Sequence, residues 1–118
     1  MCKVCDNISK KFPLDASNHS SAFNDYIWAY KTLRQKVQKG YIEFLAGDCP
    51  LNDIEKHIDV EDLYTMYHYF KCKCNKIFFV GFCCRGMPLG KIISKLPDNI
   101  AEISNGHFGT YYEKKYSL

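Results

Sequence analysis

The sequence lacks the long apolar run that a membrane-spanning helix needs, since no stretch approaches about 20 consecutive apolar residues. The first twelve residues, MCKVCDNISKKF, also lack the apolar core of a signal peptide. We therefore expect a cytoplasmic chain with no membrane partner. Internal repeats, low-complexity tracts and linkers are missing as well, so residues 1–118 are expected to form a single domain.

The usual sequence signatures of catalysis are also missing. The four histidines (His19, His57, His68 and His107) show no metal-type spacing such as HExxH. There is neither a phosphate-binding glycine loop nor a nucleophile elbow. A Cys-His nucleophile pair, for example Cys83 with His68, stays open, although no oxyanion-hole signature accompanies it. We expect no enzymatic activity.

Cysteine, by contrast, is abundant: the chain has seven. Their number is odd and no signal sequence is present, so reduced thiols or thiolate–metal bonds are expected rather than a disulfide framework. Cys2 and Cys5 form a CxxC pair and Cys72 and Cys74 a CxC pair, and together they are the candidate zinc ligands.

The neighbouring pair at 83–84 is excluded from that zinc site. In a hairpin that turns near residue 75, it would lie roughly 20 Å from Cys72, whereas zinc–sulfur bonds are about 2.3 Å. Two other interpretations stay open. The thiols can be reduced side chains in an aromatic environment, or Cys2 and Cys5 can serve a thioredoxin-like redox role, which the sequence supports poorly because it lacks a βαβ pattern.

One helix is clearly indicated, in SSAFNDYIWAYKTLRQKVQKG. Large apolar side chains recur there at the spacing of a single helical face: Phe23, Tyr26, Ile27, Tyr30, Leu33 and Val37. Gly40 suits the left-handed position just past a helix end. The pattern predicts a long amphipathic helix over 21–39.

Strand signals follow the helix. YIEFLAG predicts a short strand over 41–46, and the next segment predicts a connector with a helical turn over 51–58. Strands are expected over 63–73 and 76–84, with a tight turn at Cys74-Asn75 because asparagine tolerates positive φ. In that register Cys72 lies opposite Ile77.

The remaining segments are short. Residues 91–96 fit either a strand or a short helix, 110–114 a last strand, and 4–12 a short helix. The sum is an α+β fold in which one long amphipathic helix packs on a three- to five-stranded antiparallel sheet. We expect Tyr30 and Leu33, with their neighbours on the helix face, to pack on Phe70 and Phe79.

Charge is unevenly distributed along the chain. Residues 43–62 contain seven acidic residues and one basic residue (Lys56), whereas the rest of the chain carries fifteen basic and six acidic residues. If the fold keeps the acidic segment together, the molecule has surfaces of opposite charge. Nucleic-acid binding by aromatic residues and by Lys71, Lys73 and Lys76 is the rival interpretation, but the acidic segment would repel a polyanion, so we expect no nucleic-acid partner.

These features together resemble the immunity proteins encoded beside bacterial contact-dependent growth-inhibition toxins and other polymorphic toxins. The resemblance is carried by SSAFNDYIWAYKTLRQKV, YIEFLAGDCPL and FKCKCNKIFFVGFCCRGMPLGK, in a small chain without a catalytic set. It implies that the chain binds a cognate toxin domain, often a nuclease, and covers its active site. Many such proteins are acidic, whereas this chain has a net charge of +3.

The acidic segment would then supply the contact surface, because a toxin that acts on nucleic acid needs a basic cleft that carboxylates can fill. Tyrosines beside the segment would serve as apolar anchors. The candidate partner-binding residues are Glu43, Asp48, Asp53, Glu55, Asp59, Glu61, Asp62, Tyr64 and Tyr67.

Overall fold

The computed structural model describes residues 3–10, 12, 19–63, 65–81, 89–103 and 106–116. Side chains are described in these ranges except at Val4, Cys5, Ser9, 19–23, Leu89 and 115–116. The elements are, in chain order, α1 (Lys3–Ser9), α2 (His19–Gln38), β1 (Ile42–Gly47), the 3-10 helix η1 (Leu51–Asp53), α3 (Ile54–Val60), β2 (His68–Cys72), β3 (Ile77–Gly81), β4 (Leu89–Ile93), α4 (Ile100–Ile103) and α5 (Thr110–Tyr116).

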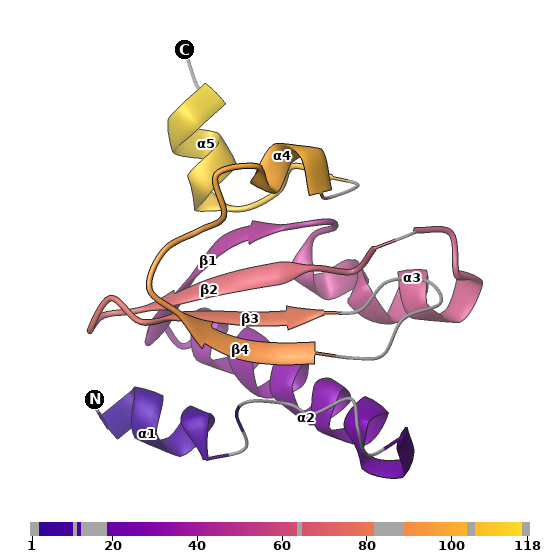
Figure 1. Ribbon diagram of the computed structural model, residues 1–118, viewed down its shortest axis with the longest axis horizontal. Helices are drawn as coiled ribbons and strands as arrows, with labels where there is room; N and C mark the ends of the chain where they lie inside the picture. The colour runs from indigo at the N-terminus through magenta and orange to yellow at the C-terminus, as the bar shows by residue number, and fades with distance from the viewer. Residues whose placement is uncertain are drawn as a thin grey trace.

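Within the described ranges, four strands form one antiparallel sheet in the order β1-β2-β3-β4. The helices α1 and α2 cover one face of the sheet, and α4 and α5 lie over the other (Figure 1). Because β2 and β3 are covered on both faces, most of the side chains in HYFKC and IFFVG are buried. The α+β class and the antiparallel sheet are confirmed.

The face of the sheet that meets α2 holds the larger group of buried side chains. Tyr26, Tyr30 and Leu33 of α2 are buried there with Phe70 and Phe78 of the sheet. This spacing of three and four residues places the helix residues on one side of α2. That α2 is amphipathic over its whole length stays a prediction, because the side chains of 19–23 lie outside the description.

The opposite face has its own buried group, formed by Ala46, Tyr69, Ile77, Ile100 and Tyr112, against which Phe79 packs. The prediction that Phe79 contacts the helix α2 is therefore wrong, and its neighbour Phe78 holds that place.

The β2–β3 turn explains this error. The turn occurs where the sequence predicts it, with Asn75 at φ 72°. However, the Cys72 N–H donates to the Lys76 carbonyl, so three residues rather than two make the loop, and Lys71 instead of Cys72 pairs with Ile77. A shift of one residue in the register moves every side chain of β3 to the other face.

The segment 110–114 is also helical, where a strand is expected from its aromatic residues. Gly109 has φ 110°, and its carbonyl accepts the Tyr112 and Glu113 N–H groups, which begins α5. Tyr112 then packs on the second face of the sheet. Packing thus overrides a β-type local composition. No described helix has the length and apolar character to cross a membrane.

Candidate functional site

The densest group of carboxylates lies around α3, at one end of the molecule (Figure 1). Asp59, Glu61 and Asp62 are exposed at the C-terminal end of the helix, and Asp53 is half-buried at its start. The apolar Val60 is 59% exposed among them. An exposed apolar side chain bordered by carboxylates is suited to bind a partner surface in which basic residues surround a small apolar patch. We call Asp53, Asp59, Val60, Glu61 and Asp62 the acidic surface.

Glu55 differs from these residues because it is engaged within the chain. Its two carboxylate oxygens each accept a hydrogen bond of 2.7 Å from the Arg34 guanidinium, and the Tyr30 hydroxyl donates to it at 3.1 Å. Arg34 also donates to the Leu51 carbonyl at 3.0 Å. The guanidinium lowers the pKa of Glu55 to about 2, and burial raises that of Tyr30 to about 12. Glu55 therefore fastens α3 to α2.

A sharp bend holds the C-terminal end of α3 in place. Glu61 adopts the left-handed conformation at φ 52°, and its N–H donates to the His57 carbonyl. The His57 Nδ1 then lies 2.7 Å from Asp62, and this hydrogen bond lowers the pKa of the carboxyl. These contacts fix the direction in which Val60 and its charged neighbours point.

Asp48 does not belong to this surface, which corrects the prediction for that residue. Its side chain is buried, with a relative exposure of 2%. One carboxylate oxygen accepts hydrogen bonds of 2.7 Å from the Thr65 hydroxyl and from the Tyr67 N–H. Asp48 thus joins the end of β1 to the start of β2, and a partner cannot reach it.

The other predicted partner-binding residues are dispersed. Glu43 lies on β1, where Thr110 donates to its carboxylate and Lys114 Nζ is 3.5 Å away, and the Thr110 bond lowers its pKa. Tyr67 is half-buried, with its ring against Phe79 at a centroid distance of 5.4 Å. It therefore lies on the second face of the sheet rather than beside α3. Tyr64 lies outside the described residues.

A buried Cys-His pair exists, but it involves Cys49, which the sequence interpretation did not pair with histidine. The His68 Nε2 donates to the Cys49 carbonyl at 3.0 Å and lies 3.7 Å from its sulfur. Burial raises the pKa of the Cys49 thiol to about 12 and lowers that of His68. The geometry therefore favours a neutral thiol beside a neutral imidazole, which is unsuited to a nucleophile. Cys83 lies outside the described residues.

The zinc prediction stays a prediction, because Cys2 and the side chain of Cys5 lie outside the description. Cys72 is buried on the α2 side of the sheet and Cys74 is half-buried in the turn. Figure 1 places α1, which carries Cys5, at the same end of the molecule as this turn. Among the described residues, no group of three or more His, Cys, Asp or Glu side chains could hold a metal ion.

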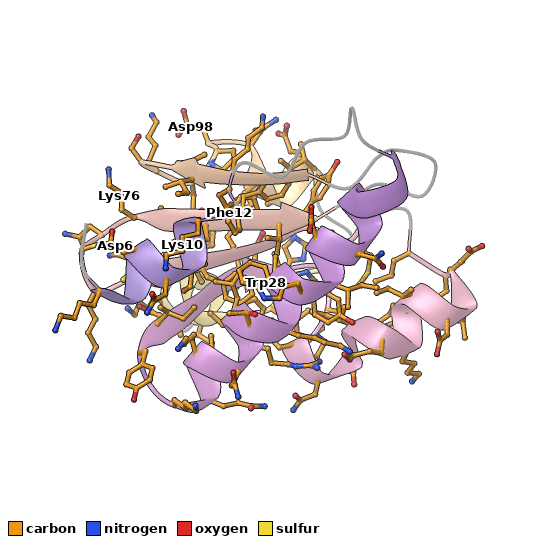
Figure 2. All side chains as sticks on the ribbon, turned by 90° about the horizontal axis from the view of Figure 1, so that it is seen from below. Asp6, Lys10, Phe12, Trp28, Lys76 and Asp98 are labelled. Atoms are coloured by element: carbon orange, nitrogen blue, oxygen red, sulfur yellow. The ribbon has the colours of Figure 1, made fainter. Side chains whose placement is uncertain are left out.

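At the end of the molecule opposite α3, Lys76 and Lys10 lie together with Asp6 and Asp98 (Figure 2), and Lys71 and Lys73 line a hollow of about 340 Å³ with Tyr41 and Glu43. The Tyr41 ring is 44% exposed, and Lys36 Nζ lies 5.4 Å from its centroid. The charge segregation expected from the sequence is therefore only partial, because Glu43 of the acidic segment lies among these lysines.

No family model matches the chain, and neither a curated protein nor a solved structure matches it.

Proposed function

We propose that this chain is an immunity protein. It binds a cognate bacterial toxin domain that acts on nucleic acid and blocks the toxin's active site. In this role it works in the cytoplasm of the cell that makes the toxin, as in contact-dependent growth inhibition. Protection requires binding alone and no chemistry by this chain. The long amphipathic helix expected over α2 serves as the rigid support against which α3 is held.

The observation that carries this proposal is the acidic surface. Its carboxylates can occupy positions that phosphates take in the basic cleft of a nuclease, and charge complementarity would speed association. Val60 supplies an apolar contact at its centre, and its exposure of 59% leaves it available to a partner. The Arg34–Glu55 pair holds the surface in one orientation, which lowers the entropy lost on binding.

The experiment that tests the proposal uses two double charge reversals that change the net charge equally. Asp59→Lys with Glu61→Lys alters the acidic surface, and Asp98→Lys with Glu102→Lys alters exposed residues near α4. Each variant is co-expressed with the toxin domain encoded next to the gene, and survival and association rate are measured. We expect the first pair to slow association at least 10-fold and to abolish protection, and the second pair to protect like wild type.

Full protection by the Asp59→Lys, Glu61→Lys variant would remove the acidic surface from the interface. If the unmodified chain neither binds nor neutralises that toxin domain, the immunity function itself is wrong.

A second candidate function, a zinc-stabilised module that binds single-stranded nucleic acid, is favoured by the lysines near the β2–β3 turn alone. There, an exposed tyrosine lies beside several lysines, which is the combination that stacks on bases and contacts phosphates. Titration of a labelled oligonucleotide at low and physiological salt tests it. Binding that weakens steeply with salt supports this function, and no binding at low salt excludes it.

A further inference from the structure

The outer edge of β1 is only partly covered. β1 is the outer strand of the sheet, next to β2. At one end of β1, Gly47 exchanges both backbone hydrogen bonds with Phe108, at 2.8 and 3.2 Å. At the middle, the Thr110 hydroxyl lies 3.0 Å from the Phe44 carbonyl and shares its one hydrogen between this oxygen and the Glu43 carboxylate. Uncovered strand edges are sites where another chain can add a strand.

The β1–β2 pairing shows which groups point outwards. The Cys72 N–H is directed away from β1, because it donates to the Lys76 carbonyl. Cys72 and its partner Ile42 therefore form a non-hydrogen-bonded pair, and so do Phe70 and Phe44 two residues along. Ile42 N–H, Ile42 C=O and Phe44 N–H thus face the edge, and no described residue forms a hydrogen bond with them there.

A groove of about 480 Å³ runs beside this open edge. Its apolar walls come from Val37 of α2, Pro50 and Leu51 at η1, and Phe108 before α5. Phe108 is 42% exposed, so its ring is accessible to a partner that enters the groove. The groove therefore offers both backbone partners and an apolar pocket for a side chain.

The charges around the groove specify what would fit. The residues that line it include two carboxylates, Glu43 and Glu113, and neither lysine nor arginine, and the nearest described cation is Lys114, whose Nζ lies 3.5 Å from Glu43. One wall is η1, which leads directly into Asp53 and α3, so the groove borders the acidic surface. An extended segment with an apolar side chain between basic residues would match the groove in shape, backbone and charge.

We infer that the toxin domain docks by adding an extended segment to β1. This segment pairs with Ile42 and Phe44, places an apolar side chain in the groove, and directs flanking lysines or arginines to Glu43 and Glu113. The inference rests on the proposed function, since it describes how the same partner is bound. It also gives Glu43, which lies apart from α3, a role in the interface.

The test uses a probe peptide, a six-residue chain of alternating lysine and valine capped at both ends, with the isotope-labelled full-length protein. We expect saturating peptide to slow amide hydrogen exchange at Ile42 and Phe44 about 10-fold. The Glu43 amide, which faces Lys71 in a hydrogen-bonded pair, should exchange slowly with and without peptide. This alternation distinguishes strand addition from general stabilisation.

Two matched pairs of variants separate the groove from the rest of the surface. Phe108→Ala should weaken peptide binding about 10-fold, whereas Tyr41→Ala, which removes an aromatic ring of similar exposure, should leave it unchanged. Glu113→Lys should weaken binding several-fold, and Glu102→Lys, an exposed glutamate outside the groove, should not.

Four results would overturn the inference. The first is unchanged exchange at Ile42 and Phe44 with the peptide at 10 mM, a concentration far above a roughly micromolar to millimolar dissociation constant. The second is equal protection by a peptide with glutamate in place of lysine. The third is a dimer in sedimentation together with slow hydrogen exchange at Ile42 and Phe44 in the absence of peptide. A second copy of the chain would then occupy the edge. The fourth is full protection from the toxin by the Phe108→Ala variant. That result would leave the proposed function in place and exclude only this docking mode.

Discussion

Arg34 and Glu55 form the side-chain contact that most constrains the acidic surface. The guanidinium makes two parallel hydrogen bonds of 2.7 Å and is only 19% exposed, while the carboxylate is 42% exposed. A parallel pair of this kind depends on the planar guanidinium, which lysine cannot reproduce. Solvent around the carboxylate reduces its contribution to stability, so the contact acts chiefly by orienting α3.

The first prediction concerns this pair. Arg34→Lys should lower the free energy of unfolding by about 1 kcal/mol, because it keeps the charge and loses the second hydrogen bond. Lys31→Arg, on the exposed side of the same helix, serves as the control and should change stability little. Urea denaturation at pH 7 measures both. Equal stability of the two variants would mean that the pair does not hold α3.

The same pair makes a prediction about pH. The pKa of Glu55 falls from its ordinary value of 4.5 to about 2, so the folded chain releases this proton more readily than the unfolded chain. The contribution to stability is therefore complete above pH 4.5 and is lost as the pH falls from 4.5 towards 2. Acid titration followed by circular dichroism should show a loss in this range that is smaller in Glu55→Gln.

His68 should act in a higher pH range. Burial lowers its pKa below 6.5, while the hydrogen bond to the Cys49 carbonyl and the charge of Asp48 oppose this shift. The unfolded chain takes up the proton first, so stability should decrease as the pH falls below about 6.5. We expect wild type to lose stability between pH 7.5 and 5.5, measured by urea denaturation. His68→Phe should lose less, and an identical loss would contradict the assignment.

At the scale of elements, the sequence predicts where chain segments are ordered better than how they meet. Tyr26, Tyr30 and Leu33 mark the helix because one face of α2 is buried, and Asn75 marks the turn because its conformation is local. The register of β2 and β3 depends on one additional loop residue, which composition does not encode. The buried position of Asp48 likewise depends on Thr65 and Tyr67, residues distant in the chain.

The register itself can be tested by mutation. Phe78→Ala should cost about 3 to 5 kcal/mol, because the side chain is fully buried against α2. Phe79→Ala should cost clearly less, because that side chain is half-buried on the other face. Urea denaturation of the two variants shows which substitution lowers the free energy of unfolding more. A larger loss for Phe79→Ala would support the two-residue loop and contradict the observed pairing.

At the scale of the whole molecule, the carboxylates of α3 and the lysines near the β2–β3 turn lie at opposite ends of a body about 41 Å long. Electrostatic steering acts on such an arrangement as on a dipole, so a charged partner would be turned towards one end before contact. The low net charge of +3 conceals this separation, which is why composition alone argues against an acidic interface.

The zinc prediction also belongs to this scale, because the ion would join the N-terminus to the β2–β3 turn. Elemental analysis of protein purified without chelator should find one zinc ion per chain if Cys2, Cys5, Cys72 and Cys74 bind it. Cys74→Ser should then lower the zinc content, and Cys83→Ser should not. A wild-type protein that is fully folded and free of metal would contradict this site.

The order of strands in the sheet has a consequence for the rate of folding. Each described strand pairs with the strand that precedes or follows it in the chain, so the sheet requires no crossover between distant segments. Such nearby pairings shorten the search for native contacts, and folding should take milliseconds rather than minutes. In the proposed role, a protective chain synthesised alongside its toxin must be ready before the toxin is active. If the chain has that role, rapid self-assembly of this sheet would let even the first copies released from the ribosome protect the cell.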